Sequence, residues 1–130
     1  TKKYIQSDKT IKTLNKGQQN KHIIGTNEYK QYVDKFKNIN KYGPSQITIN
    51  KDEIADLIKK YSGTGSISIK NGKWDNKETI LSNDKIVGYA VNNITGKQAE
   101  TTVFKIHYSK NGVHIVPDYP SKRRVKEWKA

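Results

Sequence analysis

The sequence predicts an α+β fold, in which N-terminal amphipathic helices are followed by an antiparallel β-sheet of about four strands. Two segments in the first half place apolar side chains at helical spacing, whereas the second half alternates apolar and polar residues with a period of two. Turn signals at Asn71-Gly72 and Asn111-Gly112 divide this second half into strands. The 130 residues suit a single domain, and no internal repeat is visible.

The chain divides into three regions by composition. Residues 1–20 are polar with scattered Ile and Leu, as in a linker or loosely attached arm, so a boundary is expected near Asn20. Residues 21–120 are expected to form the folded domain, and residues 121–130 form a basic tail. Methionine is absent, even at position 1, which indicates a segment of a longer chain or a processed product.

The first helix is expected to begin at Thr26 or Asn27, because either side chain can cap a helix N-terminus. It should end before Tyr42-Gly43-Pro44. One apolar stripe, at i, i+3, i+4 and i+7, is formed by Tyr29, Tyr32, Val33 and Phe36.

A second helix is expected after a short extended step at Ile47 and Ile49. Asn50 and Glu53 nearly match a capping box, with Asn in place of Ser or Thr. Gly63-Thr64-Gly65 should end this helix. Its apolar face is formed by Ile54, Leu57, Ile58 and Tyr61.

The remainder of the chain is expected to be mostly sheet. Ile67 and Ile69 alternate with serine before the turn at Asn71-Gly72. Further β-rich segments are expected at 86–91, 101–108 and 113–116, with a loop at 92–96.

The hairpin around Asn111-Gly112 should gather polar residues on one face. A two-residue loop pairs Ser109 with His114, and a four-residue loop pairs His107 with His114, but both give the same assignment of faces. A three-residue loop with a bulge would separate the two histidines. In the first two cases the polar face carries Lys105, His107, Ser109, His114 and Val116. The opposite face carries Phe104, Ile106, Tyr108, Val113 and Ile115.

Two histidines, a hydroxyl and a lysine on one face can cleave RNA without a metal. One imidazole takes the proton of the 2′-OH, a second protonates the leaving 5′-oxygen, and lysine or hydroxyl donors stabilise the phosphorane. A single strand histidine is more often an ordinary half-exposed residue, but two of the chain's three histidines, His107 and His114, share this face.

The third histidine, His22, precedes the first helix, whose N-terminus favours an anion. Thr26 could cap that helix or contact a phosphate there. Lys21 and Lys105 are further candidates for binding phosphate charge. The segment around His22 is therefore a candidate second wall of the site, although it also suits an ordinary loop.

The net charge of +13 attracts polyanions, so nucleic acid is the first candidate partner, and an acidic protein fits equally well. The absence of cysteine excludes disulfides, thiolate metal sites and cysteine nucleophiles. No carboxylate cluster with metal-ligand spacing stands beside the histidines, so we expect no metal and no other cofactor. A serine hydrolase is disfavoured because no nucleophile elbow surrounds Ser109. No apolar run approaches the roughly 20 residues of a membrane span, so we expect no membrane partner.

Four segments taken together resemble the bacterial polymorphic toxin type 50 domain, and they are Lys21–Thr26, Gly43–Ser45, Tyr61–Gly65 and Ile106–Pro117. The resemblance covers about residues 20–120. It implies the barnase, EndoU, colicin and RelE-like ribonuclease fold. It carries over, as site residues, His22, Thr26, His107, Ser109 and His114.

The resemblance also implies a biological setting. Such domains lie at the C-terminus of larger secreted toxins that act in bacterial competition, and a cognate immunity protein holds them inactive. For this chain we expect delivery to the target-cell cytoplasm, an acidic immunity protein, an RNA substrate and a monomeric state. Related modules also occur at the ends of phage head proteins.

The sequence therefore predicts a metal-independent endoribonuclease toxin domain that uses attack by the 2′-OH. His114 and His22 are the expected acid–base pair, while His107, Ser109 and Thr26 position groups or contact phosphate. The alternatives are a non-catalytic nucleic-acid-binding module of a phage structural protein, or a DNase.

Overall fold

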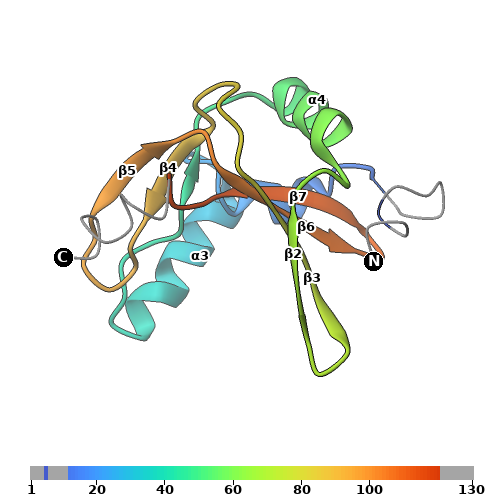
Figure 1. The fold of residues 1–130 in the computed structure, drawn as a ribbon. Coiled ribbons are helices and arrows are strands. Elements are labelled where there is room, and N and C mark those ends of the chain that lie inside the picture. The colour runs from blue at the N-terminus through green and yellow to red at the C-terminus, as the bar shows by residue number, and fades with distance from the viewer. Residues whose placement is uncertain (1–4, 6–11, 121–130) are drawn as a thin grey trace.

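The computed structural model describes residue 5 and residues 12–120, and it has the predicted α+β architecture (Figure 1). The helices are α2 (Lys16–Asn20), α3 (Asn27–Asn38) and α4 (Lys51–Tyr61). The strands are β1 (Gln46–Ile47), β2 (Ser66–Lys70), β3 (Lys73–Ile80), β4 (Gly88–Val91), β5 (Gln98–Thr101), β6 (Phe104–Ser109) and β7 (Gly112–Pro117).

The strands form two antiparallel sheets, where the sequence predicted one. The larger sheet has the order β2-β3-β6-β7, and the smaller has the order β1-β4-β5. The expected single strand at 101–108 is divided between them, because β5 ends at Thr101 and β6 begins at Phe104. The backbone N–H of Val103 donates to the Thr101 hydroxyl at 3.0 Å and so closes the bend between the sheets.

Both long helices begin where the sequence predicted. Thr26 caps α3, since its hydroxyl accepts a hydrogen bond from the backbone N–H of Tyr29 at 3.1 Å. Asn50 and Glu53 form the complete capping box of α4, with both reciprocal bonds present. The helices differ in burial, because α4 buries three side chains and α3 buries none.

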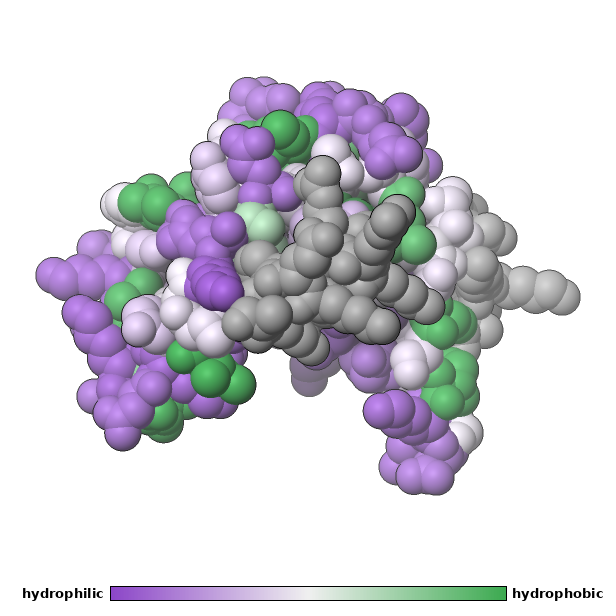
Figure 2. Space-filling view, turned by 60° about the vertical axis from the view of Figure 1, so that its left-hand side comes forward, coloured by the Kyte–Doolittle hydropathy of each residue, from purple (hydrophilic) through white to green (hydrophobic). Residues whose placement is uncertain are grey.

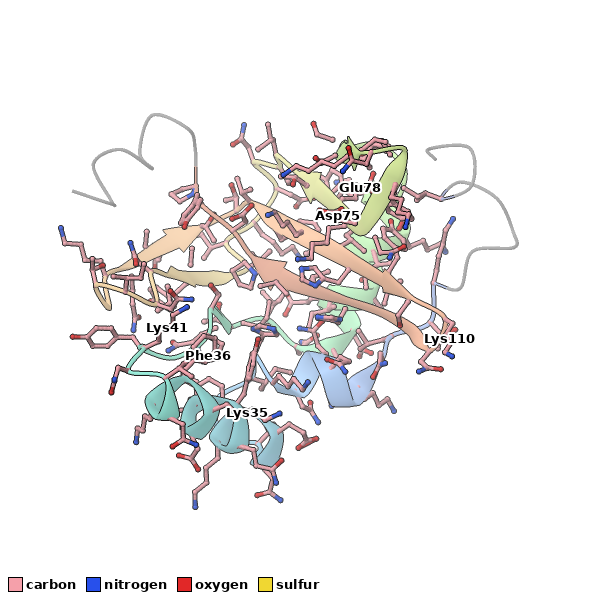
Figure 3. All side chains as sticks on the ribbon, turned by 90° about the horizontal axis from the view of Figure 1, so that it is seen from below. Lys35, Phe36, Lys41, Asp75, Glu78 and Lys110 are labelled. Atoms are coloured by element: carbon pink, nitrogen blue, oxygen red, sulfur yellow. The ribbon has the colours of Figure 1, made fainter. Side chains whose placement is uncertain are left out.

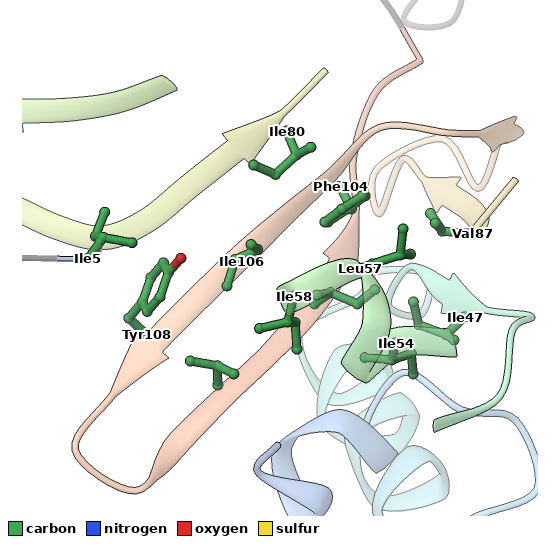
Figure 4. Packing of buried hydrophobic residues seen from close by; sticks show 12 residues of the cluster. Ile5, Ile47, Ile54, Leu57, Ile58, Ile80, Val87, Phe104, Ile106 and Tyr108 are labelled. Carbon is green, nitrogen blue, oxygen red and sulfur yellow. The ribbon is translucent and has the colours of Figure 1, made fainter. Parts of the chain in front are cut away.

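The hydrophobic core lies between α4 and one face of the four-stranded sheet (Figure 4). The helix contributes Ile54, Leu57 and Ile58. The sheet contributes Phe104, Ile106, Tyr108, Val113 and Ile115, all buried. These five residues are the face of the C-terminal hairpin that the alternation predicted to be apolar. The opposite face of β6 and β7 is therefore left for polar groups, away from α4.

The register of the C-terminal hairpin is the one expected for a four-residue loop. His107 pairs with His114, and Ser109 pairs with Gly112. The predicted turn type at Asn111-Gly112 is wrong, because only Gly112 has a positive φ, at 123°. Glycine is required there by a close approach, since a Cβ at Gly112 would lie 2.5 Å from the carbonyl oxygen of Thr13.

Residues 13–19, here called the strap, cover the outer edge of β7. The backbone N–H of Asn15 donates to the carbonyl of Val113 at 2.7 Å, and the N–H of Val113 donates to the carbonyl of Thr13 at 2.8 Å. The buried amide of Gln19 forms two further bonds with the Ile115 backbone, at 2.9 and 2.7 Å. The predicted loose arm is thus wrong for residues 12–20, because they supply an edge strand's missing partners. The predicted tail at 121–130 lies outside the described residues.

The hairpin of β2 and β3 extends beyond the rest of its sheet (Figure 1). Its turn has φ values of 53° at Asn71 and 72° at Gly72, as a type I′ turn requires. Pairing between β3 and β6 begins only at Lys77 opposite His107. Residues 68–76, here called the β-arm, therefore project past the edge of β6.

A histidine cluster as the candidate active site

The three histidines of the chain meet on the polar face of β6 and β7. His107 and His114 lie opposite each other in the ladder, with ring centroids 4.7 Å apart. His22, from the turn between α2 and α3, stacks on His114 with centroids 6.0 Å apart and planes inclined by 15°. His114 thus lies between the other two imidazoles. The cluster joins the C-terminal hairpin to a residue that lies 85 positions before His107 in the sequence.

Hydrogen bonds of the surrounding backbone fix the orientation of His22. Its Nδ1 lies 2.9 Å from the carbonyl oxygen of Ser45. A carbonyl can only accept, so Nδ1 carries the proton and Nε2 presents a lone pair. The His22 carbonyl accepts from the N–H of Ile47 at 2.7 Å, and the ring lies nearly perpendicular to that of Tyr32, with centroids 5.8 Å apart. The ring therefore has little freedom to turn.

The hydroxyl of Thr26 serves the turn that carries His22. It donates to the carbonyl oxygens of Asn20 at 2.7 Å and Ile23 at 2.9 Å, and it accepts from the N–H of Tyr29. The single proton of the hydroxyl is thus shared between two backbone carbonyls, and no donor remains for a phosphate oxygen. Thr26 accordingly stabilises the turn that carries His22.

Ser109 has a comparable role at the hairpin turn. Its hydroxyl donates to the Gly112 carbonyl at 2.9 Å and accepts from the Asn111 N–H at 3.2 Å. It still borders the same pocket as the histidines. Its local bonds hold the end of the hairpin closed.

A pocket of about 380 Å³ lies over the cluster. The hairpin contributes His107, His114 and Ser109 to its lining, the strap contributes Asn15 and Gln18, and β3 contributes residues 75–77. His22 is only 6% exposed and does not border this pocket. Two imidazoles are therefore accessible to a substrate, and the third lies behind His114. Seen from below, this face lies between α3, with Lys35 and Phe36, and the hairpin that carries Asp75 (Figure 3).

Lysine side chains surround the cluster. Lys77 lies opposite His107 in the β3–β6 ladder, and its charge acts on both His107 and His114. Lys21 lies with its Nζ 5.5 Å from the centre of the Tyr32 ring, and its charge acts on His22 and His114. Lys105 also acts on His107, but its Nζ is 3.7 Å from the Asp118 carboxylate. Lys77 is thus a more available cation than Lys105.

Burial and neighbouring charge both lower the pKa values of these histidines. Desolvation is the largest cause at His107, whose pKa falls to about 4, followed by the charge of Lys77. Desolvation also dominates at His114, whose pKa falls to about 3, followed by repulsion from His107 and His22. Burial lowers the pKa of His22 as well, against the opposing effect of its bond to Ser45. The free protein at neutral pH therefore holds three neutral imidazoles beside cations, an environment that a bound anion would relieve.

Among residue 5 and residues 12–120, no group of three or more His, Cys, Asp or Glu side chains is arranged to hold a metal ion. In the same residues, no helix has both the length and the apolar character needed to cross a membrane.

The sequence did not predict Lys77, Asn15 or Gln18 as residues of this site. The turn at Asn71-Gly72 indicates a hairpin that contains Lys77, but the pairing of β3 with β6 depends on contacts between distant segments. Asn15 had a readable signal, because an Asn three residues before Gln18 can cap a short helix, as it does here.

Comparison with known protein families matches residues 14–117 to the family described as Bacterial toxin 50. The matched segment begins in the strap and ends with β7, so it contains every residue of the histidine cluster. No curated protein matches the chain.

Proposed function

Because the chain belongs to the Bacterial toxin 50 family and is a polymorphic toxin domain, we propose that it is a metal-independent endoribonuclease. The observation that carries this proposal is the pair of accessible imidazoles, His107 and His114, beside the Lys77 ammonium in one pocket. Two imidazoles and a cation are the groups needed for RNA cleavage by attack of the 2′-OH.

In the proposed reaction His114 is the base and His107 is the acid. His114 accepts the proton of the 2′-OH as that oxygen attacks phosphorus, and His107 gives a proton to the leaving 5′-oxygen. Because the two imidazoles interact, they hold the catalytic proton as a pair, and the assignment of base and acid to individual rings is part of the proposal. Lys77 stabilises the additional negative charge of the phosphorane.

This mechanism changes the acid–base pair expected from the sequence. His22 was expected to act with His114, but it is nearly inaccessible and outside the pocket lining. We propose instead that His22 positions His114 by stacking. Thr26 acts one step further back, through the turn, and Ser109 acts through the hairpin end.

The decisive experiment is RNA cleavage by the purified chain in excess EDTA. We expect cleavage of RNA, no cleavage of an all-2′-deoxy analogue, and a loss of about 10² to 10⁴ in rate for His107→Ala or His114→Ala. Circular dichroism spectra would establish that both variants fold. Intact RNA in EDTA, or full activity of His114→Ala, would contradict the proposal.

The same experiment separates the alternatives. Cleavage of the deoxy analogue would indicate a DNase, and binding of RNA without cleavage would indicate a nucleic-acid-binding module. If His22→Asn cleaves RNA at a rate within tenfold of the parent, the positioning role of His22 is supported. A loss of rate as large as that of His114→Ala would instead indicate that His22 belongs to the acid–base pair.

The family implies a secreted toxin. We propose that the domain acts in the target-cell cytoplasm, where RNA is accessible, as the C-terminal part of a larger toxin. A net charge of +13 favours an acidic immunity protein that covers the pocket in the producing cell. Co-purification with such a partner, and loss of cleavage in the complex, tests this part of the proposal.

A further inference from the structure

The β-arm rises directly from the rim of the histidine pocket. Asp75 and Asn76 border the pocket, and Lys77 pairs with His107. From there residues 68–76 continue past the last β3–β6 pair. In Figure 2 the arm is the leg at lower right, with a hydrophilic tip and a hollow between it and the lobe at lower left.

Specific contacts hold the base of the arm in place. The Trp74 indole N–H donates to the Lys77 carbonyl at 2.8 Å, and its ring packs on Tyr108 at 5.4 Å between centroids. The N–H of Lys77 donates to the Asp75 carboxylate at 3.1 Å. Asn76 bends the strand with a φ of 64°. The arm therefore has a defined direction relative to the two accessible imidazoles.

The arm presents an excess of positive charge. Lys70 and Lys73 form the pair that closes its turn, and both are exposed, as is Lys77. Within the described part of the chain, ion pairs are formed by Lys60, Lys85 and Lys105, and by none of the arm lysines. The single acid of the arm, Asp75, bonds the backbone. Lys70 and Lys73 on the arm, and Lys77 at its base, thus remain available to a polyanion that leads out of the pocket.

We propose that the β-arm is a phosphate-backbone subsite for the RNA strand on one side of the scissile bond. This inference rests on the proposed ribonuclease function and specifies its substrate as a strand that extends several nucleotides past the cleaved bond. Lysine ammonium groups bind phosphate as point charges and do not read bases, so the subsite is independent of sequence. It raises affinity for long RNA without taking part in the chemistry.

The test compares Lys70→Gln/Lys73→Gln with a control that removes the same charge from the last turn of α4, Lys59→Gln/Lys60→Gln. The control residues lie on α4, on the opposite side of the four-stranded sheet from the histidines. Substrates are a dinucleotide, which reaches only the pocket, and a 12-nucleotide RNA. We expect the arm variant to cleave the dinucleotide like the parent, but to show a KM about five- to tenfold higher for the 12-mer.

Binding of an uncleavable 2′-deoxy 12-mer, followed by fluorescence anisotropy across salt concentrations, gives a readout that needs no activity. Loss of two phosphate contacts should reduce the slope of log K against log salt by about 1.4. Equal slopes and equal KM values in parent and arm variant overturn the subsite, as does an equal loss in the α4 control. If the parent binds the 12-mer with a steeper salt dependence than the arm variant but cleaves neither RNA, the ribonuclease function is contradicted and the subsite on the arm is supported.

Discussion

At His107 and His114, burial and charge act in the same direction, and both oppose protonation. Each imidazole lies near other imidazoles and near Lys77, and no carboxylate contributes to the shift of either pKa. A phosphate placed in the pocket would reverse the balance, because it adds the missing negative charge. Binding of an anionic substrate should therefore be accompanied by proton uptake at the histidine pair.

The pH dependence of RNA cleavage should reflect the low pKa values of the two histidines. We expect kcat/KM to fall as pH rises above about 4, because the free protein loses the proton of its acid, His107. Lys77→Gln removes a cation that lowers the pKa of both histidines. The pH above which kcat/KM falls should therefore increase, while kcat decreases. The pH dependence of dinucleotide cleavage measures both effects. Lys59→Gln, on α4, should leave the pH at which kcat/KM falls unchanged. An unchanged value in Lys77→Gln would count against the histidine pair as the titrating groups.

Folding stability should also depend on these histidines. The unfolded histidines have a pKa of about 6.5, whereas the native pKa values are about 4 and about 3. As pH falls below 6.5 the unfolded chain binds protons that the native state refuses, so stability is lost. Each histidine should contribute about 1 kcal/mol per pH unit between pH 6.5 and its native pKa. Urea unfolding at pH 7 and pH 5 should show a smaller loss for His114→Gln than for the parent, and equal losses would refute the linkage.

The sheet face on which each strand residue lies was predictable, whereas the hydrogen-bond partners of the Thr26 and Ser109 hydroxyls were not. The parity of β6 and β7 put His107 and His114 on one face because successive strand side chains point to opposite sides. Thr26 and Ser109 also carried a readable signal, but it was a signal for caps and turns. Their hydroxyls satisfy nearby backbone groups, which the sequence could not distinguish from substrate contacts.

Two identical dipeptides show how neighbouring elements decide a local structure. Asn71-Gly72 forms the turn that its sequence predicts, in a hairpin that projects beyond the rest of its sheet (Figure 1). Asn111-Gly112 does not, because Gly112 pairs with Ser109 as the first residue of β7, which places the turn at Lys110 and Asn111. Glycine is required at 112 because the strap occupies the space where a side chain would lie.

The strap offers a direct test of edge protection in β7. Gln19→Ala would leave the buried N–H and carbonyl of Ile115 without the partners that the amide supplies. We expect a loss of about 2–4 kcal/mol in the free energy of unfolding. Gln18→Ala, at the adjacent exposed position, should change it by less than about 0.5 kcal/mol. Chemical denaturation of both variants at pH 7 provides the comparison, and similar values for the two would contradict the role of Gln19.

Across the whole molecule, the site depends on segments that no local pattern could join. The hairpin histidines were predictable together, and His22 was added through the family resemblance. Lys77 and the strap were not predictable, because β3–β6 pairing and the strap–β7 contact are long-range. The second sheet was missed because β1, β4 and β5 are short, and because β1 pairs with β4, a strand distant from it in sequence.

The domain boundary that composition predicts near Asn20 can be tested by truncation. A chain that begins at Lys21, the boundary predicted from composition, loses Gln19, one wall of the pocket and the buried side chain of Ile5. We expect it to be largely unfolded at 25 °C, as measured by far-UV circular dichroism and urea titration, while residues 1–120 remain folded. A stable chain 21–130 would show that the strap is dispensable.

The attachment of the strap also determines how mechanical tension would reach the site. A pull on the chain upstream of Thr13 is resisted by Ile5, whose side chain is buried in the core, and then by the two backbone bonds that join Thr13 and Asn15 to Val113. Val113 is the immediate neighbour of His114, and Asn15 forms part of the pocket wall. Force on the N-terminal side would therefore act on the core at Ile5 and, through the strap, on the pocket wall. A domain threaded through a narrow channel from that end would lose both early, whereas the helices α3 and α4 would enter the channel later.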